Sequence, residues 1–279
     1  MASRRARVGA VVAALTAGLL VIGGGAWAIA AAATRNGDAV AARSADTTHH
    51  ERLSSPSTAP VTTPVIPSPT PTPTPTFDSG AYSIDDPTSI WVVVNKSRAL
   101  NPVDAVPPDL VQPPVPNING QPVRKAVSDA LAALFAAAKS EAGLDLTLQS
   151  GYRSYDTQVS VYDEDVAANG QAYADTDTAR PGHSEHQTGL AVDISAASGR
   201  CSLDACFGQT PEGQWLAANA WRFGFLLRYP QDKVAVTGFT YEPWHFRYVG
   251  EPLSTELHET GVTTLEEYFG VPGGESYPG

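Results

Sequence analysis

The sequence predicts an α+β fold, a single compact domain in which a small, mainly antiparallel sheet is flanked by helices. Two observations lead to this class. Runs with strand character and runs with helix character are mixed without the regular βαβ order that builds a doubly wound parallel sheet. The folded part must also be smaller than the 279-residue chain, because much of the first third lacks the composition of a packed core.

The first 33 residues predict an export segment. Arg4, Arg5 and Arg7 precede an uncharged, mostly apolar run of 26 residues at 8–33, which can cross a bilayer at about 20 residues per span. A removable signal peptide usually has about 7 to 15 apolar residues, so the length favours an uncleaved transmembrane anchor, although the Ala-rich end could be cut. Positive charge before the run places the N-terminus in the cytoplasm and the remainder outside.

The composition of residues 34–80 predicts a linker that cannot form a hydrophobic core. They are rich in Ala, Ser, Thr and Pro, and they include an alternating Pro-Thr tract at 67–76. Alternating prolines favour an extended polyproline chain of about 3.1 Å per residue, so this disordered segment is expected to act as a semi-rigid spacer that could carry O-linked sugar. The folded domain is expected at 81–270, with a flexible tail at 271–279.

Within the domain, apolar spacing and capping residues predict the elements in chain order. An apolar run at 90–94 predicts the first strand, and side chains at helical spacing from Pro122 to a stop at Gly143 predict the first helix. A strand at 146–149 leads into a second helix that Ser154 can cap. After a strand at 189–194, a third helix opens at Pro211. Two last elements are expected, a strand at 239–246 and a short helix that begins with a Thr-x-x-Glu capping box at 264–267.

The negative charge of the folded part excludes some classes of binding partner. The formal net charge is −11, and residues 1–52 hold six Arg against three acidic residues, so the rest of the chain holds about −14. Nucleic acids and anionic lipids need basic surface, which argues against either as a partner of the folded part.

The only two cysteines, Cys201 and Cys206, are expected to form a local disulfide outside the cell. Zinc binding by this pair would require further Cys or His residues at ligand spacing.

Two short stretches, residues 181–193 and 242–245, indicate a metal site whose ligands come from separate parts of the chain. The chain has six His, and three of them, His183, His186 and His245, fall in these stretches. A lone His is more often a surface or hydrogen-bonded residue, but His186, Asp193 and His245 together offer two imidazoles and a carboxylate, a set that suits zinc and leaves a fourth position for water. Taken singly, Asp193 could be a buried residue bonded to backbone amides, and His183 could be a plain loop residue or a substrate-facing group.

Two further side chains are candidates for the chemistry. Glu242 would be a carboxylate free to take a proton from water. Glu242 and His245 are three residues apart, however, and would point to opposite faces of a regular strand, so Pro243 must mark a bulge or a strand end. Arg153, in a turn before the second helix, is either a clamp for an anion or a surface Arg.

The motifs resemble those of the VanY-type D-alanyl-D-alanine carboxypeptidases, zinc peptidases of the bacterial cell wall. The resemblance rests on Ser-Gly-Tyr-Arg-Ser at 150–154 with Gln158, on the Ser-x-His-x-x-Gly-x-Ala-x-Asp pattern at 184–193, and on Glu-Pro-Trp-His at 242–245. It covers about residues 85–270. The fold that it implies is the one of the zinc D,D-carboxypeptidases and of hedgehog-like domains.

Carried over position by position, the resemblance implies one zinc ion held by His186, Asp193 and His245, with Glu242 as the catalytic base. It also implies that Arg153 faces the substrate carbonyl or carboxylate, and that two polar residues bind substrate, namely Gln158 and Ser184. The segment with the two cysteines has no match in the family pattern, so its effect on a cleft is left open.

The expected reaction is removal of the terminal D-alanine from a peptidoglycan stem peptide. The alternatives are an endopeptidase with the same zinc set and a non-catalytic wall-binding module on the same fold, although a binder has no need of Glu242 as a base. The expected partners are the stem peptide and, through the N-terminal segment, the membrane. We expect a monomer in the bacterial cell envelope, either anchored or secreted, and no nucleic-acid partner.

Overall fold

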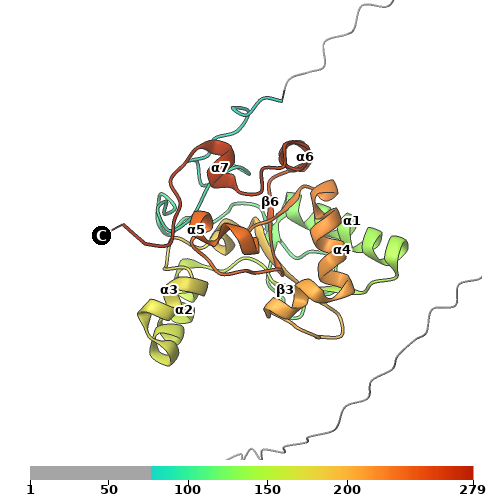
Figure 1. Ribbon diagram of the computed structural model, residues 1–279, viewed down its shortest axis with the longest axis horizontal. Helices are drawn as coiled ribbons and strands as arrows, with labels where there is room; N and C mark the ends of the chain where they lie inside the picture. Colours follow the sequence, from blue (N-terminus) through green and yellow to red (C-terminus); the bar gives the residue numbers. More distant parts are fainter. Residues whose placement is uncertain (1–76, 279) are drawn as a thin grey trace, which may run out of the picture. The chain divides into compact units, whose positions relative to one another are not determined.

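The computed structural model describes residues 77–278, which form the helices and small sheets drawn in colour in Figure 1. The apolar run at 8–33 and the Pro-Thr tract lie outside the described residues. Within 77–278, no helix is both long enough and apolar enough to cross a membrane.

The centre of the fold is a four-stranded antiparallel sheet in the order β3-β4-β6-β5. A second, two-stranded sheet pairs β1 with β2. The α+β class predicted from the sequence is therefore confirmed for the described residues. The strands are β1 (Leu110–Val111), β2 (Val123–Arg124), β3 (Leu146–Ser150), β4 (Ala191–Ala196), β5 (Phe225–Leu227) and β6 (His245–Tyr248).

Helices surround this sheet (Figure 1). The longest helix, α1, packs beside α4. The helices α2 and α3 pack against each other and lie at the lower left of Figure 1. The α-helices are α1 (Lys125–Ala142), α2 (Tyr155–Asn169), α3 (Gln171–Asp177), α4 (Pro211–Asn219), α5 (Val234–Thr237), α6 (Glu251–Thr260) and α7 (Leu265–Phe269). Short 3₁₀ turns lie between them, at η1 (Glu185–Thr188), η2 (Ala205–Gln209), η3 (Ala220–Phe223) and η4 (Gln231–Lys233).

The predicted helix signals act as expected. In α1 the apolar residues at helical spacing are fully buried, and Gly143 ends the helix in the left-handed conformation that a glycine adopts without strain. Ser154 caps α2 through the amide of Thr157. Thr264 caps α7 through the backbone N–H of Glu267, as predicted from the capping-box residues, and its hydroxyl also donates to the carboxylate of Glu267 at 2.8 Å.

The start of the first helix differs from the prediction. It begins at Lys125 rather than at Pro122, because Val123 and Arg124 pair with β1 before the helix can start. The apolar spacing read from the sequence does not reveal this two-residue pairing, since Val123, which is fully buried, continues the apolar spacing of the helix.

One predicted strand is wrong, and another begins later than predicted. Residues 92–94 are buried but belong to no strand, and the guanidinium of Arg247 donates hydrogen bonds to the carbonyls of Ile90 and Val92 in place of a neighbouring strand. The strand expected at 239–246 starts only at His245, since Pro243 and Trp244 form a turn before it. The run at 92–94 is thus buried without a partner strand, whereas the run at 239–244 has mixed burial, with Thr240 exposed.

The segment after α7, for which we expected flexibility, hydrogen-bonds along the domain. The amide of Asn95 donates to the carbonyl of Pro272 at 3.0 Å, and the backbone N–H of Gly274 donates to Val236 at 2.8 Å. Tyr277 accepts the backbone N–H of Arg180 at 2.8 Å. These contacts tie the end of the chain to the stretch that leads into η1.

Candidate metal centre

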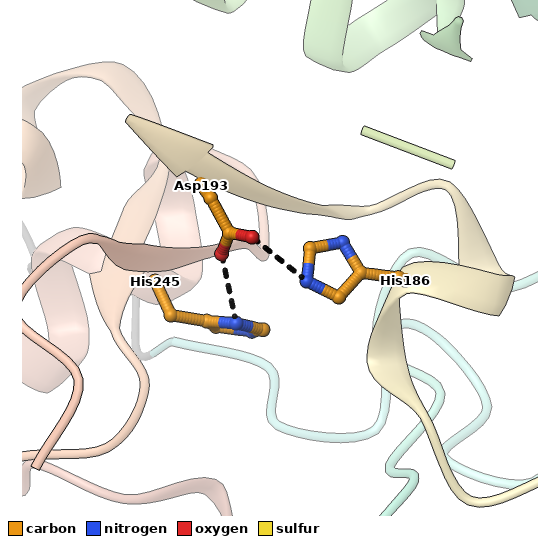
Figure 2. Close-up of side chains that lie close together, drawn as sticks. All are labelled: His186, Asp193 and His245. Atoms are coloured by element: carbon orange, nitrogen blue, oxygen red, sulfur yellow. Dashed lines mark ion pairs between the residues drawn. The ribbon is translucent and has the colours of Figure 1, made fainter. Parts of the chain in front are cut away.

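Three different elements supply the predicted ligands. His186 lies on η1, Asp193 lies on β4, and His245 is the first residue of β6, directly opposite Asp193 in the antiparallel pair. Each residue is buried, and one donor atom from each comes within 4.8 Å of the others. Figure 2 shows the carboxylate of Asp193 placed between the two imidazoles. The structure therefore brings together the three residues that the sequence set apart by up to 59 positions.

The carboxylate of Asp193 faces one nitrogen of each ring. Its oxygens lie 3.4 Å from Nε2 of His186 and 3.3 Å from Nδ1 of His245, and Oδ1 has no hydrogen-bond partner. Burial acts to raise the pKa of Asp193, but the two histidines outweigh burial and hold this pKa well below its usual range. A buried, ionised oxygen without a donor is the group that a metal ion would satisfy.

The ring of His186 is oriented by the backbone of the Ser-Gly-Tyr-Arg-Ser turn. Its Nδ1 lies 2.8 Å from the carbonyl oxygen of Gly151, so Nε2 is left to face Asp193. Gly151 is needed at this place, because an added Cβ would lie only 2.7 Å from the carbonyl oxygen of Pro122. The glycine thus lets the chain approach closely enough to fix the first ligand.

The ring of His245 is backed by a buried ionic network. Its Nε2 points toward Glu185, 3.6 Å from Oε2, while Oε1 of Glu185 accepts hydrogen bonds from Arg228 at 2.8 Å and from Arg247 at 2.9 Å. Arg228 also holds Glu266 through two bonds of 2.9 and 2.6 Å. All four charged partners are buried. We call Glu185, Arg228, Arg247 and Glu266 the buried ion network.

Sequence reasoning missed this network. Glu185 occupies a variable position of the predicted metal motif, and Arg228 and Arg247 follow apolar residues of β5 and of β6. Arginines placed among buried apolar residues are the signal that could have found it, since a buried guanidinium requires a carboxylate partner.

The turn at Pro243 resolves the geometry of Glu242. The backbone N–H of His245 donates to the carbonyl of Glu242 at 3.1 Å, and this turn places Oε2 of Glu242 3.5 Å from Nδ1 of His245. Burial raises the pKa of Glu242 to about 8, against a smaller opposing effect of His245. The prediction that the strand must break at Pro243 for both side chains to share one site is confirmed.

The centre opens into a cleft of about 680 Å³. Arg153 and Ser184 line it together with Glu242, as the resemblance implied. Gln158 does not line it. Its side chain is fully buried, accepts a hydrogen bond from Nη1 of Arg153 at 3.1 Å and donates to the carbonyl of Ala179 at 2.7 Å.

His183 does not line the cleft either. Its Nδ1 lies 2.8 Å from the carbonyl oxygen of Asn95, and its ring meets that of Tyr277 edge to face. Burial lowers its pKa. The structure thus gives His183 the role of a hydrogen-bonded loop residue, the plainer of the two interpretations.

The two cysteines form the predicted local disulfide, with Cα atoms 5.5 Å apart. The residues that it encloses reach the site, because Leu203, Asp204 and Ala205 all line the cleft. This answers the question that the sequence left open about the unmatched segment, which is part of the cleft wall.

Comparison with known proteins places this geometry in a family. A sequence profile of VanY, described as D-alanyl-D-alanine carboxypeptidase, matches residues 120–251. The chain is 44% identical over 195 residues to YodJ of Bacillus subtilis, a protein classed by its name with the carboxypeptidases, and the match covers 68% of this chain and 70% of YodJ. The chain belongs to the VanY family. The recognition of this family from three short motifs is thereby confirmed.

Three solved structures extend the VanY comparison. The LdcB LD-carboxypeptidase is 44% identical with a TM-score of 0.62, over 67% of this chain and 89% of that one. A VanY D,D-pentapeptidase in complex with Zn(II) is 38% identical with a TM-score of 0.53, over 64% and 97%. VanYB in complex with D-alanine-D-alanine is 37% identical with a TM-score of 0.55, over 64% and 96%. The described domain therefore shares the VanY fold.

Proposed function

We propose that this protein is a zinc-dependent carboxypeptidase that hydrolyses the terminal D-alanine from peptidoglycan stem peptides. The observation that carries the proposal is the placement of Glu242 beside His186, Asp193 and His245 at one cleft, in a chain of the VanY family. A wall-binding module would have no use for a buried carboxylate next to three potential ligands.

The three residues fit a single zinc ion. Two imidazole nitrogens and one carboxylate oxygen are a donor set of catalytic zinc sites, and the carboxylate of Asp193 faces one nitrogen of each ring while its Oδ1 has no hydrogen-bond partner. Zinc, when bound, would polarise a carbonyl and bring the pKa of a coordinated water toward about 7. The related VanY pentapeptidase was crystallised with Zn(II), which supports the choice of metal.

The side chains around the metal centre would have separate roles in the hydrolysis. Glu242 would take the proton of the attacking water and return it to the departing amine, which leaves the new carboxylate and free D-alanine. Arg153 is the sole Lys or Arg side chain among the described residues that line the cleft, and it would hold the terminal carboxylate of the peptide or offset charge that develops on the scissile carbonyl oxygen. Gln158 would position Arg153, and Ser184 would bind the peptide backbone.

A specific observation favours a second candidate substrate. The chain is 44% identical to LdcB, an LD-carboxypeptidase, and 38% identical to the D,D-pentapeptidase. The scissile bond could therefore be the L,D bond of a tetrapeptide stem rather than the D,D bond of a pentapeptide stem. Both reactions release D-alanine through the same residues.

We propose that the folded domain lies outside the cytoplasmic membrane. The support is the sequence alone, namely the apolar run at 8–33 that follows three arginines and the Pro-Thr spacer that follows the run. Whether the run stays as an anchor or is cleaved, the domain would reach wall peptides. We also propose that the protein acts as a monomer.

The test is product analysis on defined stems. The purified full chain would be incubated with pentapeptide and tetrapeptide stems, with zinc or with a chelator, and mass spectrometry would identify the products. We expect zinc-dependent release of one D-alanine. Cleavage inside the stem would show an endopeptidase instead, and the absence of zinc-dependent release from either stem would refute the proposal.

A further inference from the structure

Two large apolar side chains are exposed on the lining of the cleft. Tyr173 of α3 is 54% exposed and Leu203 of the disulfide loop is 45% exposed. Of the six large apolar residues that are exposed in the described part of the chain, these are the two that line the cleft. An exposed apolar side chain within a binding cleft is a surface that a ligand can bury.

Leu203 is held in an uncommon backbone conformation. Its φ is +52°, and Cys201 of the same loop has a φ of +55°, a left-handed region that residues with a Cβ seldom adopt. Such a conformation persists only where surrounding bonds impose it, and it is found most often at ligand sites. Here the disulfide between Cys201 and Cys206 closes the loop, and Asp204 accepts the backbone N–H of Cys206 at 2.8 Å.

The loop is fixed to the strands that carry the centre. Ser202 bonds to Ser195 of β4 at 2.9 Å and donates to Gln149 of β3 at 3.1 Å. On its other side, η2 packs on the turn that holds Glu242. An added Cβ at Gly208 would overlap the hydroxyl of Tyr241 and would lie 3.3 Å from Cβ of Pro243. Leu203 therefore has a set position relative to both Asp193 and Glu242.

We propose that the disulfide loop, residues 199–209, is a substrate subsite in which Leu203, together with Tyr173, packs against the aliphatic part of the peptide on the N-terminal side of the scissile bond. This inference rests on the proposed function. A carboxypeptidase substrate has a single residue on the leaving side, and that residue ends in a carboxylate suited to Arg153. The apolar lining is thus left for the chain that leads to the scissile bond.

The test compares a long and a short substrate. A complete stem peptide spans the subsite, whereas an N-acetylated dipeptide with the same scissile bond lacks the upstream residues. For Leu203→Gly and Tyr173→Ala we expect kcat/KM for the stem to fall about fivefold to tenfold, as when an anchoring apolar contact is removed, with no change for the dipeptide. Ile118→Ala, which truncates an apolar residue that is 59% exposed and lies outside the cleft, is the control and should leave both values unchanged.

Leu203→Gly also separates function from folding. Glycine accepts a φ of +52° without strain, so this variant should melt no lower than the unsubstituted chain while it loses stem turnover. A double Cys201→Ser, Cys206→Ser variant frees the loop and should show the same selective loss for the stem. Equal losses on both substrates, or no loss on the stem, would overturn the subsite.

A binding measurement decides the inference without turnover. In zinc-free protein, the methyl signals of Leu203, assigned by their absence from Leu203→Gly, should shift on addition of the stem peptide and stay in place with the acetylated dipeptide. Failure to shift with the stem would overturn the subsite. Failure of the proposed function is a different result, since it shows as no release of D-alanine by the unsubstituted chain.

Discussion

Replacement of Glu185 by Gln tests whether the buried ion network positions His245. The network contains two arginines and two glutamates, all nearly inaccessible to solvent, so its charges balance. In Glu185→Gln the side chain keeps its size but loses its charge. Arg228 retains Glu266, whereas Arg247 loses its carboxylate partner and keeps the carbonyls of Ile90, Val92 and Tyr248 and the neutral amide oxygen of the new side chain.

The expected loss of stability follows from that imbalance. Breaking a buried ion pair costs about 3 to 5 kcal/mol, and the remaining amide oxygen of Gln places this case at the lower end, about 3 kcal/mol. A domain of this size loses about 2 to 4 °C of Tm per kcal/mol, so Glu185→Gln should melt about 6 to 12 °C lower. Loss of the carboxylate behind His245 should also weaken zinc binding about 10-fold to 100-fold.

The assay is thermal unfolding of zinc-free protein, followed by competition for zinc with a chromophoric chelator. Glu141→Gln is the matched control, because the ion pair of Glu141 with Arg222 is about 40% exposed and solvent screens exposed pairs so that they contribute little to stability. The reasoning is refuted if Glu185→Gln melts within about 2 °C of the unsubstituted chain and binds zinc equally well.

Three further predictions concern single groups. Glu242→Gln should lower kcat by about 10² to 10⁴ while zinc still binds, and full retained turnover would remove Glu242 as the base. Arg153→Ala should lower kcat/KM by about a hundredfold, and Gln158→Ala by less, since Gln158 acts through Arg153; a larger effect of Gln158→Ala on kinetics would contradict this order. Burial acts to raise the pKa of Glu185, but Arg228 and Arg247 outweigh it and hold this pKa well below the usual value. Its contribution to stability should thus be complete above about pH 4.5 and be lost as the pH falls through the folded pKa, so the Tm difference from Glu185→Gln should shrink in acid.

Local signals in the sequence predicted much of the helical structure. Apolar spacing in α1 and the capping residues Ser154 and Thr264 act over a few positions, so they could be predicted locally, and only the start of α1 is shifted by pairing with β1. The metal ligands could be predicted for a different reason. Zinc imposes a narrow choice of residue types, so two imidazoles and a carboxylate in matching motifs specify one another even 59 positions apart.

The features that could not be predicted from the sequence all depend on residues that are distant in the chain. An apolar run becomes a strand only if another strand can pair with it, and at 92–94 the carbonyl that would pair is taken by the side chain of Arg247 instead. Glu185 could not be assigned a partner, because the arginines that hold it lie 43 and 62 positions away. The cleft wall made by Leu203 likewise depends on how the loop folds back on β3 and β4.

The contacts of Tyr277 bear on the order in which the metal centre can form. Tyr277 bonds to Arg180 and packs on His183, three residues before the ligand His186. His245 lies only 32 positions before Tyr277. A growing chain therefore cannot complete the centre before residue 245 has been synthesised, and the contacts that hold the stretch leading to His186 form only once residue 277 is also available.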